Sequence, residues 1–225
     1  MSTRDNISEM YRNPAVRTAM LADAAALATT TFGPLDKYVP ANDNVPPRTG
    51  DFMQTFTGRK YWPIDPRPHE VYIEDIAHSL GLQCRYAGHC IKFYSVAEHS
   101  VLIARHLAAT HAPEVALAGL LHDAPEAYCV DIPRPLKPYL TNYRAIEQDN
   151  WLAIAARFQL DRELPKAVHD ADNRIIADEL VNLREMPWHA RYNNPLGMKL
   201  RYWSPEEAEI EFLATFDALM AGRAA

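Results

Sequence analysis

The residues best suited to chemistry stand together at the end of an apolar run. His122, Asp123 and Glu126 directly follow the apolar residues 115–121, with Pro125 among them. A proline inside a helix lacks an N–H and clashes with the carbonyl four residues earlier, so the helix is expected to kink or end here. An imidazole and two carboxylates beside a helix break predict a functional site.

Two further polar groups lie on inward faces of expected helices. His99 shares a face with the apolar residues of a helix expected at 96–110, and Asp172 lies in the apolar arc of a helix expected at 165–185. A buried carboxylate is unfavourable unless it is paired or bound to a metal, so Asp172 is a candidate metal ligand. The alternatives are a satisfied core histidine at position 99 and a buried salt bridge at position 172, with Glu179 as a neighbour.

Other histidines compete for the same role. His106 also faces inward and is expected to be a core residue. In the second His-Asp pair, His169-Asp170, the aspartate falls on the side of its helix opposite to Asp172, so we expect Asp170 to be solvated.

The inward groups form a mixed set of nitrogen and oxygen donors, namely His99, His122, Asp123 and Asp172. Such a set suits Mn, Co, Zn, Fe or Mg better than a thiolate site would, and it predicts one divalent metal ion as cofactor. Four protein ligands leave two positions of an octahedral ion for water and a substrate oxygen, so the ion could activate water as a nucleophile. The three cysteines lack ligand spacing, which makes a structural zinc protein a weak alternative.

The elements that must position these groups are expected to be helices. Ser95 and Glu98 have the form of a capping box, and Ser204, Pro205 and Glu207 give a second strong start signal. No stretch alternates convincingly over five or more residues, so the predicted fold class is all-α. The helices are expected at residues 7–32, at 73–80 with Gly81 as the end, at 96–110, from Pro113 to the His-Asp pair, and at 143–158, 165–185 and 205–220.

Length and composition favour one domain with an N-terminal extension. We assign residues 1–68 to an N-terminal helix plus a proline-rich extension packing on the domain, and residues 69–225 to the domain itself. A net charge of −6 gives no general drive toward nucleic acid or an anionic membrane. Neither a signal segment nor a run of about 18 apolar residues is found. With an odd number of cysteines, a reduced cytoplasmic protein is the simplest interpretation.

The order His99, His122-Asp123, Asp172 resembles the HD-domain superfamily of metal-dependent phosphohydrolases, an all-helical fold named for its His-Asp pair. The resemblance covers residues 73–183, and it is closest to bacterial 5'-deoxynucleotidases and phage-type dATP triphosphohydrolases. It is carried by Ser95-Val-Ala-Glu-His99-Ser, by Leu120-Leu-His-Asp-Ala-Pro-Glu126, by Asp131-Ile-Pro-Arg-Pro-Leu-Lys137 and by Asp172.

The resemblance implies roles for residues outside the ligand set. Glu126 matches the proton-transfer glutamate, Asp131 matches an aspartate near the sugar, and Arg85 matches an arginine that contacts phosphate. Tyr86 stands where a tryptophan commonly follows that arginine, and base stacking is assigned to it. Lys137 would join Arg85 in neutralising phosphate charge, with plain solvation as its alternative.

The expected reaction is the attack of activated water on the α-phosphorus of a deoxynucleotide, releasing nucleoside and either phosphate or triphosphate. The basic residues Arg59, Lys60 and Arg67 favour a triphosphate if the proline-rich segment covers the site. The alternative from another class is a non-catalytic, metal-stabilised nucleotide sensor. The expected partner is a small-molecule nucleotide, and exposed helical faces are compatible with a homo-oligomer.

Overall fold

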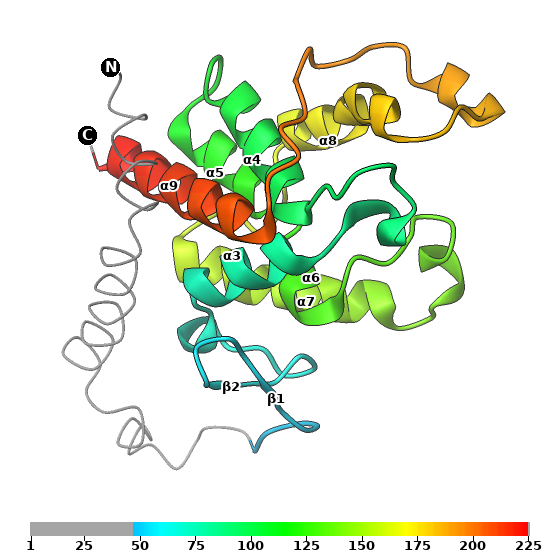
Figure 1. Cartoon of the computed structure of the whole chain (residues 1–225). Helices are drawn as coiled ribbons and strands as arrows, with labels where there is room; N and C mark the ends of the chain where they lie inside the picture. Colours follow the sequence, from blue (N-terminus) through cyan, green and yellow to red (C-terminus); the bar gives the residue numbers. More distant parts are fainter. Residues whose placement is uncertain (1–46, 225) are drawn as a thin grey trace. The chain divides into compact units, whose positions relative to one another are not determined.

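The computed structural model describes residues 47–224, and from Gly50 onward they form one compact unit (Figure 1). The helix expected at residues 7–32 lies outside the described residues. Within them the protein is mostly helical, as predicted, with one small antiparallel hairpin. The elements are β1 (Met53–Gln54), β2 (Lys60–Tyr61), α3 (Ile73–Leu82), α4 (Val96–Leu107), α5 (Pro113–Leu121), α6 (Glu126–Cys129), α7 (Tyr143–Phe158), α8 (Lys166–Glu179) and α9 (Pro205–Arg223), with single 3-10 turns at Pro68–Glu70, Arg85–Gly88, Lys137–Tyr139, Leu180–Asn182 and Pro187–Arg191.

Helix α4 lies at the centre of the core. It packs against α3, α5, α8 and α9, and α9 also packs against α3 and α5. Its residues from Val96 to Ala104 are all buried, including His99. The ligand expected on α4 therefore emerges from the most enclosed part of the protein.

The predicted helix boundaries hold where the signal is local. Helix α7 spans the predicted residues, α5 begins at Pro113, and α5 ends at Leu121, so the expected break before α6 at Pro125 is confirmed. The expected extension of α8 to residue 185 is wrong, because the helix ends at Glu179. Tertiary contacts fix this end: the buried Asn182 side chain accepts from the Lys92 N–H at 2.9 Å and donates to the Lys92 carbonyl at 2.9 Å.

Gly81 does not end its helix, contrary to the sequence expectation. Helix α3 continues to Leu82, and Gly81 is buried against the start of α9. A Cβ atom at position 81 would lie 2.9 Å from the Pro205 carbonyl oxygen. The glycine therefore serves the close approach of two helices.

The capping box at the start of α4 is only half formed. Ser95 Oγ accepts from the Glu98 N–H at 3.0 Å, as predicted. The Glu98 carboxylate does not reach back, because it accepts the N–H groups of three successive residues before α9, at 2.5 Å from Arg201, 3.0 Å from Tyr202 and 2.9 Å from Trp203. The box at Ser204 and Glu207 is complete. Glu98 thus anchors the segment that leads into α9 rather than its own helix.

We expect Glu98→Gln to lower the free energy of unfolding by about 2 kcal/mol, because an amide replaces a buried charged acceptor of three N–H groups. Urea denaturation of the two proteins measures the difference. Glu206→Gln, an exposed change in the first turn of α9, is the control and should cost less than about 0.5 kcal/mol. Equal effects of the two substitutions would show that the three backbone contacts do not stabilise the fold.

The hairpin segment packs on α6 and α7. Tyr61 is fully buried, stacks on the Tyr128 ring with centroids 3.7 Å apart, and donates to Asn150 Oδ1 at 2.6 Å. Asn150 in turn donates to the Pro63 carbonyl at 2.8 Å. Strands of two residues are too short to show alternation, which is why the sequence does not reveal them. Among the described residues, no helix is both long and apolar enough to cross a membrane.

Candidate metal centre

Three helical regions bring the four expected metal ligands together. His99 comes from α4, His122 and Asp123 come from the turn between α5 and α6, and Asp172 comes from α8. Ligand atoms of His99, His122 and Asp172 all lie within 4.8 Å of one another. Asp123 Oδ2 lies 3.5 Å from His99 Nε2 and 3.3 Å from His122 Nε2. Three of the four predicted ligands therefore form one cluster, and Asp123 lies beside its two imidazoles.

Each of the two imidazoles has one nitrogen without a hydrogen-bond partner, close to the carboxylates of Asp123 and Asp172. His99 Nδ1 lies 2.7 Å from Glu179 Oε1, and His122 Nδ1 lies 2.8 Å from the Gly119 carbonyl oxygen. Each Nδ1 faces an acceptor, so in the neutral ring Nδ1 carries the proton and Nε2 keeps its lone pair. Burial lowers the pKa of His122, but Asp123 and Asp172 outweigh it and raise that pKa well above its ordinary value, so a metal ion would replace a proton on this ring. Both Nε2 atoms are buried and have no hydrogen-bond partner. Unpartnered buried lone pairs are what a metal ion would satisfy.

The spacing of the donors also fits a shared ion. Asp172 Oδ1 lies 3.3 Å from His99 Nε2 and 3.8 Å from His122 Nε2. Donors bound to one ion at about 2.1 Å lie about 3 to 3.5 Å apart when they are neighbours. The cluster could therefore hold one metal ion.

Electrostatics at the cluster keep the carboxylates ionised. Burial raises the pKa of Asp172, but the imidazoles of His122 and His99 outweigh it and hold that pKa well below its ordinary value. The pKa of Asp123 is likewise well below its ordinary value, because His122, His99 and Arg85 outweigh burial. Both groups are thus in the form that binds cations.

Glu179 connects the imidazole of His99 to the residues around it. Its carboxylate is fully buried, and besides His99 it accepts from the hydroxyl of Tyr94 at 3.0 Å and from that of Tyr86. Arg85 Nε lies 3.5 Å from Glu179 Oε1. Arg85 and His99 outweigh burial and lower the pKa of Glu179 to about 2. The sequence placed Glu179 inward beside Asp172, whereas in the structure its partner is His99.

We expect Glu179→Gln to weaken metal binding by about tenfold to a hundredfold, because the residue that orients a ligand imidazole loses its charge. Isothermal titration with Mn²⁺ measures the affinity. Glu185→Gln is the control, since that side chain is exposed just beyond α8. Unchanged affinity in the Glu179 variant would mean that the core alone holds His99 in place.

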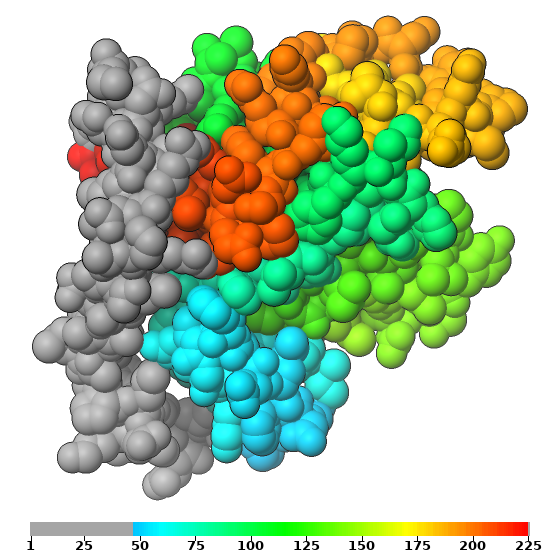
Figure 2. Space-filling model, in the orientation of Figure 1, coloured from blue at the N-terminus to red at the C-terminus, as the bar shows by residue number. Residues whose placement is uncertain are grey.

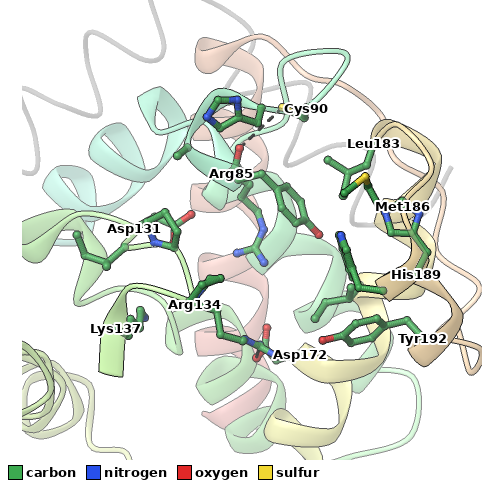
Figure 3. A pocket seen from close by; sticks show the side chains of 18 of the residues that line it. Arg85, Cys90, Asp131, Arg134, Lys137, Asp172, Leu183, Met186, His189 and Tyr192 are labelled. Carbon is green, nitrogen blue, oxygen red and sulfur yellow. Dashed lines mark hydrogen bonds and ion pairs between the residues drawn. The ribbon is translucent and has the colours of Figure 1, made fainter. Parts of the chain in front are cut away.

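A cavity of about 1270 Å³ opens beside the cluster (Figure 3). It is lined by every residue that the sequence assigned to catalysis or substrate binding, together with two of the four ligands. These lining residues are Arg85, Tyr86, Asp123, Glu126, Asp131, Lys137 and Asp172.

Glu126 faces the cavity with one carboxylate oxygen unused. It is the first residue of α6 and is buried; Oε1 lies 3.5 Å from Lys137 Nζ, while Oε2 has no hydrogen-bond partner. Burial raises its pKa well above the ordinary value, and the charges of Asp123 and Asp131 add to this. Lys137 also reaches Glu147 Oε1 at 2.8 Å, so it is held in an ion pair rather than solvated.

Gln83 ties Glu126 to Asp131, and sequence reasoning missed it. Its Nε2 donates to the Glu126 carbonyl at 3.0 Å, and its Oε1 accepts from the Asp131 N–H at 3.1 Å. No pattern in the sequence marks a glutamine at a helix end for this role.

Arg85 and Tyr86 reach the site from the turn before α4. Arg85 Nη1 lies 3.3 Å from Asp123 Oδ2, so the guanidinium contacts a predicted metal ligand and Arg85 also lines the cavity. The Tyr86 hydroxyl donates to Glu179, which ties the end of its side chain toward the cluster while the residue lines the cavity.

The second His-Asp pair and three basic residues of the N-terminal segment lie outside the site. Asp170 is paired with Arg174 at 3.3 Å on the surface, and His169 is exposed, as expected. Arg59, Lys60 and Arg67 were expected to hold a polyphosphate if their segment covers the site; that condition is not met here, since none of them lines the cavity. In Figure 2 their segment (cyan) and the yellow-orange segment that lines the cavity lie at opposite edges of the molecule. They contact the Tyr72 ring, the Phe52 ring and Asp65, respectively.

The far wall of the cavity comes from the segment after α8. Trp188 packs edge-on against His189 and Tyr192, with ring centroids 4.3 and 5.7 Å apart, and all three line the cavity. Arg184 and Arg191 line it as well, and Arg134 joins them from the opposite loop. The sequence has no periodic signal here, so this wall was not predicted.

The protein is therefore mostly helical and carries a candidate metal centre made of histidines and carboxylates. The chain is 38% identical over 132 residues to the Escherichia coli (strain K12) protein named "Uncharacterized protein YfdR", covering 59% of this chain and 72% of that protein. It is 31% identical over 188 residues to "Uncharacterized protein RCAP_rcc00048" of Rhodobacter capsulatus, covering 75% of this chain and 95% of that protein. The chain belongs to the family of these two proteins. No family model matches it.

Proposed function

We propose that this protein is a metal-dependent phosphohydrolase with an HD-domain fold that cleaves deoxynucleotides at the α-phosphorus. The observation that carries the proposal is the pair of buried, unpartnered Nε2 atoms of His99 and His122, gathered with two carboxylates beside a cavity. Ligand cavities usually measure about 300 to 1000 Å³, so this one has room for a nucleotide.

The ion would be held by His99, His122, Asp123 and Asp172, and when bound it would supply Lewis-acid polarisation and acidify water. Arg85 and Lys137 would neutralise phosphate charge from two sides of the cavity. Asp131 would contact the sugar. The aromatic wall at Trp188 would contact the base, in addition to the role assigned to Tyr86.

Glu126 would move the proton of the reaction. Its unused Oε2 is within the cavity wall but outside the ligand set, so it could take a proton from the attacking water or give one to the leaving O5'. A glutamate in that place is not needed to hold an ion. Its presence supports an enzyme over a metal-stabilised nucleotide sensor.

The arginines of the far wall favour a triphosphate over a monophosphate. Arg184 and Arg191 of this wall add two positive charges to the cavity beyond Arg85 and Lys137, and Arg134 lines it from the opposite loop. Arg134 already pairs with Asp172 at 3.6 Å, so Arg184 and Arg191 are the charges that the β- and γ-phosphates of a triphosphate would meet. This support replaces the expectation that rested on Arg59, Lys60 and Arg67.

The test is to incubate the protein with Mn, Co, Mg or Zn and a panel of nucleoside and deoxynucleoside mono-, di- and triphosphates, and to separate the products. We expect a nucleoside and an unbroken triphosphate from a deoxynucleoside triphosphate. Release of single phosphates from the γ end would contradict attack at the α-phosphorus. Binding of nucleotide without hydrolysis, with every metal, would favour the sensor.

A further inference from the structure

Two cysteines flank the turn that carries Arg85 and Tyr86. Cys84 Sγ and Cys90 Sγ lie 3.4 Å apart, and Cys90 Sγ also lies 3.8 Å from the Arg85 carbonyl oxygen. Both residues are partly exposed, and Cys90 lines the cavity on the same side as Arg85 (Figure 3). Neither thiol has a part in the proposed hydrolysis.

The backbone on both sides of the turn is fixed. Before the turn, the Arg85 N–H donates to the Tyr94 carbonyl at 2.9 Å, and Cys84 forms a β-bridge with Ser95. After the turn, the Ile91 N–H donates to the Asn182 carbonyl at 2.8 Å. Thermal motion of a loose loop therefore does not account for the closeness of the two thiols.

The turn between the cysteines has an unusual backbone. Tyr86 and Ala87 have φ values of 57° and 50°, and Gly88 has 78°. Non-glycine residues in this region are held there by surrounding structure at some energetic disadvantage. A bond between the two flanking cysteines would act directly on this strained backbone.

We propose that Cys84 and Cys90 are a reversible disulfide site that controls the position of Arg85. A small-molecule disulfide such as oxidised glutathione would be the oxidant. The thiolate of one cysteine attacks it, forming a mixed disulfide and releasing one glutathione thiol; the second cysteine then attacks the mixed disulfide and releases the other. The two cysteines lose two protons and two electrons, and the oxidant gains them.

The new bond would act on the metal centre through Arg85. A disulfide requires the sulfur atoms to approach from 3.4 Å to about 2.05 Å with a defined torsion, and we infer that the turn between them shifts as the two side chains rotate. Arg85 follows Cys84 directly and contacts both Asp123 and Glu179. Movement of its guanidinium removes the partner that fixes these two carboxylates. Burial and the adjacent Cys84 raise the pKa of the Cys90 thiol to about 11, so Cys90 rests as a thiol at neutral pH.

Peptide mapping of the full chain tests the disulfide itself. The protein is treated with oxidised glutathione, remaining thiols are alkylated, and trypsin is added. Trypsin cleaves after Arg85 and Lys92, so the two cysteines fall in separate peptides, residues 61–85 and 86–92. We expect these peptides to be joined in the oxidised protein and separated by dithiothreitol. Cys129→Ser should not change this, whereas Cys84→Ser and Cys90→Ser should abolish it. Free or merely glutathionylated cysteines at both positions in the wild type would overturn the proposal.

Mn²⁺ affinity tests the effect on the metal centre without reference to hydrolysis. We expect the oxidised protein to bind Mn²⁺ about tenfold more weakly than the reduced protein, as for loss of a residue that supports a metal ligand. The Cys84→Ser and Cys90→Ser proteins should keep one affinity under both treatments. Equal affinity of the oxidised and reduced wild type, or no Mn²⁺ binding by either, would overturn control through Arg85. Failure of the hydrolysis assay would remove only the proposed function.

Discussion

The Asp172→Asn substitution is expected to weaken Mn²⁺ affinity by at least about a hundredfold. Loss of a residue that only supports a ligand weakens metal affinity by about tenfold to a hundredfold, and this change removes a direct ligand. Asp172 Oδ1 approaches the Nε2 atoms of both His99 and His122, at 3.3 and 3.8 Å. The amide keeps the size of the side chain but removes the charge that attracts the cation. Hydrolysis should fall by about a thousandfold, since the ion contributes several kcal/mol to the reaction.

The same helix offers a matched control. Asp170 is two residues away, exposed, and paired with Arg174 on the surface. Asp170→Asn should leave Mn²⁺ affinity, measured by isothermal titration, and hydrolysis unchanged. Treatment of the wild type with a chelator should reproduce the Asp172 result, and added Mn²⁺ should restore activity. If both aspartate variants behave alike, Asp172 serves in its salt bridge with Arg134, at 3.6 Å, rather than in a metal centre.

The candidate ligands His99 and Asp172 could be found from the sequence because helical periodicity fixes the direction in which a side chain points. His99 and Asp172 fall on apolar faces, and a face that is buried by the core carries its polar members inward with it. Asp170 lies across the same helix and is solvated for the same reason. Periodicity thus separated the two His-Asp pairs before any coordinates were known.

The partners of residues that act through tertiary contacts could not be predicted from helical periodicity. Glu179 lies on the correct face, but which imidazole it meets depends on how α8 crosses α4. Glu98 has the spacing of a capping residue. Its carboxylate instead accepts hydrogen bonds from three N–H groups of a segment about a hundred residues later. Such partners are set by the packing of elements, which spacing along the chain does not encode.

Residues in irregular segments were also not predicted to belong to the site. The wall at Trp188, His189 and Tyr192 belongs to a stretch with one short 3-10 turn, so neither period of regular structure applies. The opposite loop that carries Arg134 is irregular in the same way. The cluster that could hold a metal ion was therefore predictable from helices, while the cavity wall proposed to contact the base and the phosphates was not.

Glu126→Gln is expected to lower hydrolysis by about a hundredfold to ten thousandfold, the usual contribution of a positioned proton-transfer group. Metal affinity should change little, because Glu126 is outside the ligand set. The amide is similar in size, so the buried position at the start of α6 should remain folded, and circular dichroism checks this. Single-turnover rates at saturating Mn²⁺ measure the effect on chemistry rather than on metal occupancy.

Lys137 supplies the control that separates two explanations of that loss. Its Nζ lies between Glu126 Oε1 at 3.5 Å and Glu147 Oε1 at 2.8 Å, so either glutamate could matter only by holding the lysine. Glu147→Gln removes the closer contact to Lys137 and leaves Glu126 in place. If Glu126 moves the proton, the Glu147 variant retains most of the rate. Equal losses in the two variants would instead assign the effect to Lys137, with both glutamates acting as positioning residues for a phosphate-binding cation.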